Sequence, residues 1–163
     1  MQDPKHHTDP RRSLVGFRVG DVEYAVPIQS VREIVAPLPI TPLPHAPPAV
    51  TGVIDHRGEV IPIVDLRKRF GLPAGSGARG KWILLDVEDR RIGLAVDCVT
   101  EVFGTAGAEL RPAPVVGHGD GERGIMAVAR NGATMVFVLN VRSFEELTAP
   151  VIGSLPGTER EAP

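Results

Sequence analysis

Apolar and polar residues alternate over several short stretches of the chain, and a period of two is typical of half-buried β-strands. Val22, Tyr24 and Val26 show this alternation near the beginning of the sequence. Gly20 and Asp21 precede them and suit a two-residue hairpin turn, because glycine tolerates the positive φ angle that such a turn requires. The pattern therefore predicts an N-terminal β-hairpin.

The spacing of the apolar residues changes directly after this hairpin. Ile28, Val31, Ile34 and Val35 lie three or four positions apart, which is the period of a helix with one apolar face. Pro27 suits the first position of a helix, where its missing N–H costs nothing. We therefore expect a short helical turn after this proline.

The same arrangement recurs in the second half of the sequence. Residues 94–102 align without a gap on residues 26–34, and residues 85–89 align on residues 17–21 at the same shift. A second helical turn is expected there, and Cys98 beside it is expected to pack in the core. The apolar face of this turn would consist of Val96, Val99, Val102 and Phe103.

Two further hairpins form a looser repeat. One covers residues 52–66 with a turn at Arg57, and the other covers residues 124–141 with a turn at Asn131. The second strand of each hairpin is apolar on both faces, which is typical of a strand packed between two layers. Helical turns capped by polar residues should follow, at Asp65 and Asn140. The chain is thus predicted to be mainly β, with two similar small β-barrels packed together, short helical turns and a short C-terminal helix.

Proline and glycine mark the joints between these units. Prolines recur over residues 37–48 and predict an extended, stiff connector, with a ligand for proline-reading modules as the alternative. Residues 75–80 are expected to form a flexible link between the halves, and residues 117–124 a polar, glycine-rich loop.

These joints define the expected domain organisation. We expect one domain over residues 14–149, with subdomains at roughly 14–80 and 81–149 and with an exchange of the first strand between them left open. The remaining segments, residues 1–13 and 150–163, are predicted to be disordered tails.

Composition narrows the classes of protein. The 163 residues fit one ordinary domain, and the 42% of hydrophobic residues favour a globular chain. A net charge of −2 with interspersed acids and bases gives no basic surface for nucleic acid. Cys98 is the single cysteine, which favours the cytoplasm. No apolar run approaches the roughly 18 residues that cross a bilayer, so direct membrane insertion is not expected.

Catalytic and metal-binding patterns are weak in this sequence. Asp55 and His56 are neighbours on a predicted strand and therefore point to opposite faces, which makes them a poor catalytic pair. His56 is then a turn-flanking residue, with an interface contact or a pH-sensitive site as alternatives. His118, Asp120 and Glu122 offer fewer oxygen ligands than a calcium loop requires. No cofactor, metal or enzymatic activity is expected, and a metal-dependent hydrolase that uses His56 and the His118 loop is a remote alternative.

The basic run at residues 67–69 has two interpretations. It predicts either a solvated helical face or a binding patch, and a solvated face is favoured because charged runs on helices usually face water. By exclusion, the sequence predicts a binding module.

The order and spacing of several short motifs resemble the CheW family of chemotaxis adaptors. The clearest are TPLPHAP at residues 41–47, GVI at residues 52–54 and VIPIVDLR at residues 60–67. Further matching positions are residues 20–21, 23–25, 31–34, 57–58, 96–97, 99, 101–102 and 111–114. Together the resemblance spans about residues 14–147.

This resemblance implies a fold, partners and a site. The fold would be two five-stranded barrels of the Src-homology kind. Members connect the regulatory domain of a CheA-type histidine kinase to the cytoplasmic tips of methyl-accepting receptors, as a non-catalytic scaffold in arrays of a two-component system. The implied receptor and kinase interface consists of Val31, Glu33, Gly52, Arg57 and Gly58. A CheW-like adaptor of a non-chemotaxis pathway, for motility or development, is the alternative.

One turn departs from the family pattern. The family usually carries Asn-Leu-Arg-Gly, whereas this chain carries Asp55, His56, Arg57 and Gly58. The lost apolar side chain and the added carboxylate are expected to affect which receptors are recognised. We also hypothesise that Arg57 pairs with Glu33, because an arginine on a turn can hydrogen-bond a nearby carboxylate.

Overall fold

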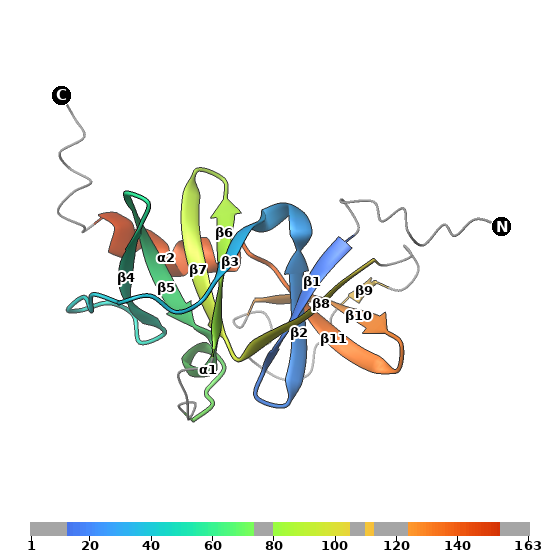
Figure 1. Ribbon diagram of the computed structural model, residues 1–163. Coiled ribbons are helices and arrows are strands. Elements are labelled where there is room, and N and C mark those ends of the chain that lie inside the picture. Colours follow the sequence, from blue (N-terminus) through green and yellow to red (C-terminus); the bar gives the residue numbers. More distant parts are fainter. Residues whose placement is uncertain (1–12, 74–79, 105–109, 113–123, 154–163) are drawn as a thin grey trace.

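Two β-sheets make up most of the computed structural model, which describes residues 13–73, 80–104, 110–112 and 124–153 (Figure 1). Sheet A has the strand order β8-β1-β2-β11-β10-β9, and sheet B has the order β3-β6-β7-β5-β4. The strands of sheet A are β1 (Ser13–Val19), β2 (Val22–Pro27), β8 (Cys98–Gly104), β9 (Arg111–Pro112), β10 (Ile125–Asn131) and β11 (Thr134–Leu139). Those of sheet B are β3 (Val31–Val35), β4 (Val50–His56), β5 (Glu59–Asp65), β6 (Lys81–Val87) and β7 (Arg90–Val96). The predicted mainly β fold of two packed units is confirmed.

The predicted hairpin turns are confirmed as well. Gly20 between β1 and β2 has a φ angle of 64°, and Gly132 between β10 and β11 has one of 66°. Between β4 and β5, Arg57 and Gly58 both have positive φ angles, 55° and 85°. Two successive left-handed residues form a type I′ turn, whose twist matches that of the flanking strands.

The sequence repeat corresponds to a reciprocal exchange of strands. Strand β3 follows β2 of sheet A along the chain but pairs with β6 of sheet B, and β8 follows β7 of sheet B but pairs with β1 of sheet A. The registers are equivalent, since Phe17 pairs with Val99 and Leu85 pairs with Val31. Sheet A therefore draws strands from both halves of the repeat. A boundary between subdomains near residue 80 stays a prediction.

The prediction of a helical turn after Pro27 is correct only for Ile28–Ser30 and is wrong from Val31 onward. A short 3-10 helix, Ile28–Ser30, leads directly into strand β3, and the second predicted turn is strand β8. The spacing was misleading because it counted Ile34 and Val102 as buried, whereas 42% and 54% of their surfaces are exposed. Cys98 is exposed instead of packed in the core, because the strand turns this residue outward.

Three apolar clusters hold the sheets together. The largest lies between the sheets and joins Phe17 and Tyr24 of sheet A to Leu94 of sheet B. A second, around Leu14 and Val136, belongs to sheet A. The third belongs to sheet B and consists of Ile54, Ile61, Ile63, Trp82 and Leu84. Burial of this apolar surface, at about 25 cal/mol per Å², is the main force that fixes the two sheets against one another.

The proline-rich connector closes sheet B. Thr41 exchanges two backbone hydrogen bonds with Val53 of β4, at 2.8 and 2.9 Å. Ile40 packs against the apolar cluster of the sheet, whereas the neighbouring prolines are exposed. Gly52 makes this approach possible, because a Cβ atom there would collide with the carbonyl oxygen of Thr41 and lie 2.6 Å from Cγ2 of Ile40.

Both predicted helix caps are present. Asp65 accepts a hydrogen bond from the backbone N–H of Arg67 at 2.9 Å and begins the short helix α1 (Leu66–Arg69). Asn140 accepts one from the N–H of Arg142 at 3.1 Å, just before helix α2 (Ser143–Gly153). Helix α2 packs on β5 and β7 and buries Phe144 (Figure 1).

Helix α2 also includes residues 150–153, for which the sequence predicted a tail. Ser13, the last residue of the predicted N-terminal tail, is buried and begins strand β1. The remaining predicted tail residues lie outside the described part of the chain, as do nearly all of the link at residues 75–80 and of the loop at residues 117–124. Among the described residues, no helix has the length and apolar character needed to cross a bilayer.

Candidate protein-interaction site

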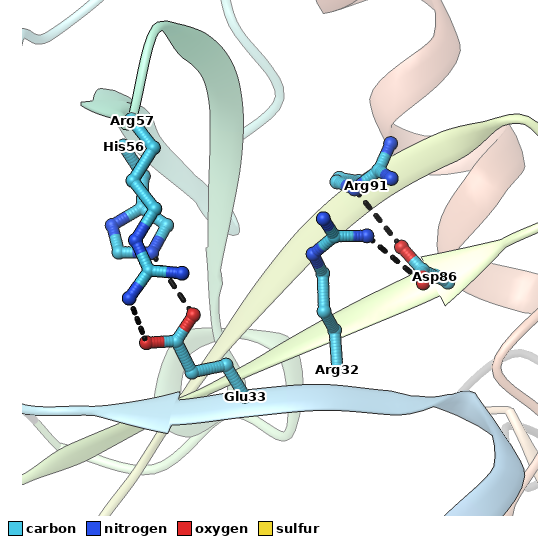
Figure 2. A network of polar contacts seen from close by, with 6 residues as sticks. All are labelled: Arg32, Glu33, His56, Arg57, Asp86 and Arg91. Carbon is cyan, nitrogen blue, oxygen red and sulfur yellow. Dashed lines mark hydrogen bonds and ion pairs between the residues drawn. The ribbon is translucent and has the colours of Figure 1, made fainter.

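The carboxylate of Glu33 joins strand β3 to the turn between β4 and β5. Arg57 donates a hydrogen bond from Nη2 to one carboxylate oxygen at 3.2 Å, and Nε2 of His56 lies 3.1 Å from the other oxygen (Figure 2). The hypothesis that Arg57 pairs with Glu33 is confirmed, although Glu33 lies on a strand instead of a helical turn. We call Glu33, Ile34, His56, Arg57 and Val60 the Glu33 corner.

The turn of the Glu33 corner is held by its own side chains. Asp55 accepts a hydrogen bond from the backbone N–H of Gly58 at 3.0 Å. Arg57 adopts a left-handed backbone that is unfavourable for a residue with a Cβ atom. Glu33 fixes the side chain of this residue, which is 73% exposed. The guanidinium group is thereby oriented at the surface, where a partner can reach it.

A second group of charges lies beside the Glu33 corner. Asp86 of β6 contacts Arg32 at 3.4 Å and Arg91 at 3.1 Å (Figure 2). Arg91 also pairs with Glu59 at 3.0 Å. Together with Glu33 and Arg57, these residues are three acids and three arginines. The surface is therefore balanced in charge, so a partner would be recognised by the arrangement of the charges instead of by their sum.

Exposed apolar side chains complete the Glu33 corner. Ile34 is 42% exposed and Val60 is 49% exposed. Val31, at the beginning of the same strand, is half-buried and packs on the cluster between the sheets. Exposed apolar side chains and arginine are both features of the central part of protein interfaces.

The five predicted interface residues occupy three different environments, and the first is that of Val31, which is half-buried against the cluster between the sheets. Glu33, Arg57 and Gly58 meet at the Glu33 corner, where Gly58 has open space around it. Gly52 is buried beneath the connector and offers no side chain to a partner. Whether these positions bind a partner stays a prediction.

Sequence reasoning missed several members of this surface. Ile34 and Val60 were assigned to buried faces because each is followed by another apolar residue, Val35 and Ile61. Asp86 belonged to no motif, and Arg32 lay within the family match at residues 31–34 without a role of its own. His56 was noted as a departure from the family turn, and its contact with Glu33 gives that departure a structural role.

Sheet A has an equivalent corner. Glu101 of β8 accepts a hydrogen bond from the side-chain amide of Asn131, which ends β10 as His56 ends β4. Val102 and Met135 are 54% and 55% exposed and occupy the positions that correspond to Ile34 and Val60. We call Glu101, Val102, Asn131 and Met135 the Glu101 corner. Gly132 stands at the position of Arg57, so this corner has no arginine on its turn.

A third polar cluster lies where the chain passes from sheet B to sheet A. Asp97, between β7 and β8, accepts hydrogen bonds from Arg67 at 2.7 and 2.9 Å and from the backbone N–H of Gly20 at 2.8 Å. The hydrogen bonds from Arg67 lower the pKa of Asp97; burial opposes this effect and the N–H of Gly20 adds to it. Arg67 is therefore not part of a solvated face, as its sequence context suggested.

The described residues contain no group of three or more side chains that could hold a metal ion. The candidate metal ligands His118, Asp120 and Glu122 lie outside the described residues.

Comparisons with known proteins agree on one family. The family model described as the CheW-like domain matches residues 13–146. The chemotaxis protein CheW of Rhizobium meliloti is 39% identical over 150 residues, which cover 89% of this chain and 96% of that protein. Protein FrzA of Myxococcus xanthus is 30% identical over 139 residues, 85% of this chain and 86% of that protein. The crystal structure of the scaffolding protein TtCheW from Thermoanaerobacter tengcongensis has a TM-score of 0.74 and 29% identity, and the match covers 80% of this chain and 89% of that one.

Proposed function

Because the chain belongs to the family of CheW-like domains, we propose that it couples a CheA-type histidine kinase to methyl-accepting chemotaxis receptors. It is a non-catalytic adaptor, as the family and the scaffolding protein of similar fold indicate. The partners would be the regulatory domain of the kinase and the cytoplasmic tips of the receptors. The protein would accordingly work in the cytoplasm, at arrays of membrane receptors.

The Glu33 corner is the observation that carries this proposal. The guanidinium of Arg57, exposed and held by a carboxylate, is an oriented hydrogen-bond donor, and Ile34 and Val60 add exposed apolar surface on strands β3 and β5. Arg57 can then bind a carboxylate or backbone carbonyls of a partner in a bidentate manner. Val31, Glu33 and Gly58 would support this contact from the strand and the turn. Gly52 would act indirectly, because it allows the connector to close the sheet.

Two corners on one rigid body suit an adaptor. The cluster between the sheets and the hydrogen bonds of Asp97 hold the Glu33 and Glu101 corners in a fixed relation. A partner bound at one site would then change the position of a partner bound elsewhere, and receptor conformation would shift the active fraction of the kinase. Individually weak contacts would be reinforced by avidity in an array.

The test is charge reversal at the Glu33 corner. Arg57→Glu should weaken binding to the kinase regulatory domain or to a receptor fragment by at least about tenfold, and Glu33→Arg in the same chain should restore part of it. Lys81→Glu, an exposed site outside the Glu33 corner, is the matched control. Affinities would be measured by titration calorimetry with partners from the same genome. The proposal fails if the unmodified chain binds neither partner, or if Arg57→Glu binds both as well as the control.

A CheW-like adaptor of another kinase pathway is the second candidate. The similarity to protein FrzA, over most of both chains, supports it. Co-purification of the chain from its native cells with an identified kinase and receptor would distinguish the pathways. A kinase without a chemotaxis receptor in the complex would favour this candidate.

A further inference from the structure

The imidazole of His56 and the guanidinium of Arg57 share one carboxylate, each at its own oxygen. The side chain of His56 is only 16% exposed, and Nε2 faces the oxygen of Glu33 that Arg57 leaves free. Histidine is the side chain whose charge ordinarily changes between about pH 5 and pH 8. Glu33 is thus held by one cation when the imidazole is neutral, and by two when it is protonated.

The second corner of the chain provides a non-titrating counterpart. Asn131 occupies the position of His56 and donates its hydrogen bond to Glu101, the counterpart of Glu33. An asparagine at this position is therefore sufficient to connect the β10–β11 turn to strand β8. The histidine adds to this contact a charge that depends on pH.

The neighbouring charges on each packed element are already paired. Glu59, the cross-strand partner of His56 in the β4–β5 hairpin, binds Arg91 of β7 at 3.0 Å. Asp86 of β6 binds Arg91 and Arg32 of β3. Asp55 accepts a hydrogen bond from the backbone N–H of Gly58 in the turn. Protonation of His56 consequently acts first on the Glu33 carboxylate and, through it, on the guanidinium of Arg57.

We propose that protonation of His56 places a second cation on the carboxylate of Glu33, weakens the hold of Glu33 on Arg57 and so frees the exposed guanidinium of Arg57 for a carboxylate of a binding partner. The proton comes from solvent and no covalent bond changes. Only the last step, capture of a partner, rests on the proposed function. The Glu33 corner is then a pH-responsive site, and the Glu101 corner is not.

The first experiment uses the isolated chain. The side-chain Nε–H signal of Arg57 would be followed by ¹⁵N NMR from about pH 8 to about pH 5.5, in the unmodified chain and in His56→Asn, which reproduces the chemistry of the Glu101 corner. The Arg57 signal should shift together with the imidazole signals of His56 and should stay constant in His56→Asn. Arg67, which is held by Asp97, is the internal control and should not follow this transition in either chain. A constant Arg57 signal in the unmodified chain, or an equal shift in His56→Asn, overturns the proposal.

The second experiment adds a partner. A kinase domain or receptor fragment that uses Arg57 should bind about threefold more tightly at about pH 5.5 than at about pH 8, and this gain should vanish in His56→Asn. Equal gains in both chains would overturn the link to binding. If the Arg57 signal responds but neither partner binds at either pH, the proposed function fails and the pH response of the Glu33 corner stands.

Discussion

Replacement of Gly52 by alanine tests whether the proline-rich connector closes sheet B. The new Cβ atom would meet the carbonyl group of Thr41, which is backbone and cannot rotate away. The connector must then separate from β4, and the two hydrogen bonds between Thr41 and Val53 are lost. These bonds contribute about 1 kcal/mol each, and overpacking a tight site costs about 1–3 kcal/mol. We expect Gly52→Ala to lower the free energy of unfolding by about 4 kcal/mol in total.

The assay can use the single tryptophan as a local probe. Trp82 lies in the apolar cluster of sheet B and is 5% exposed. Its fluorescence therefore reports whether the proline-rich connector packs against this cluster. For a chain of this size, a loss of about 4 kcal/mol corresponds to a melting temperature lower by about 10 °C. Gly132→Ala is the matched control, because Gly132 also has a positive φ angle but has no atom within 4 Å of a new Cβ. That control should lose only about 1–2 kcal/mol through backbone strain.

Two results would refute this reasoning. One is a Gly52→Ala protein that unfolds at the same urea concentration as Gly132→Ala. The other is a Gly52→Ala protein that is stable but no longer binds its partners, because Gly52 would then belong to the interface itself. The structure predicts that any loss of binding follows the loss of stability, and that binding recovers at temperatures where the variant is fully folded.

Three further predictions concern acid stability, the shared core and the exposed apolar residues. Because its pKa is lowered, Asp97 stabilises the fold above the pKa of its unfolded form, and this stabilisation is lost as the pH falls through the lower folded value. Urea midpoints should thus fall less between about pH 7 and about pH 3 in Asp97→Asn than in the unmodified chain, and an equal fall would contradict the Arg67 contact. Phe17 is fully buried between the sheets, so Phe17→Ala should cost about 3–5 kcal/mol in urea unfolding; a loss below about 1 kcal/mol would show that the sheets do not share this core. Ile34→Asp and Val60→Asp should change stability by less than about 0.5 kcal/mol and weaken partner binding by about tenfold, and unchanged affinity would exclude these side chains from the interface.

The sequence predicted those features that depend on local chemistry. Glycine at Gly20 and Gly132 fixed the hairpin turns, and Asp65 capped a helix because its side chain can reach a nearby N–H. The pairing of Arg57 with Glu33 followed from the family motif and from the reach of arginine. These inferences required only residues close in sequence, or one long side chain.

Features that depend on which strands meet could not be predicted in this way. Ile34 and Val102 matched the apolar spacing of a helix, although both side chains are exposed. Their orientation depends on the pairing of β3 with β6 and of β8 with β1, which the spacing does not reveal. The contacts of Asp97 could not be predicted either, because its partners Arg67 and Gly20 come from distant segments of the chain. A period in one dimension does not distinguish a core residue from an exposed contact residue.

The reciprocal position of β3 and β8 has a consequence for the integrity of the molecule. Each sheet is built from strands of both halves of the repeat. A fragment that ends before residue 80 should therefore leave β3 without β6, and the complementary fragment should leave β8 without β1. Two such fragments should be insoluble alone and should refold only when mixed. Mechanical load on either sheet is consequently carried to the other through the covalent backbone that crosses between them, from β2 to β3 and from β7 to β8.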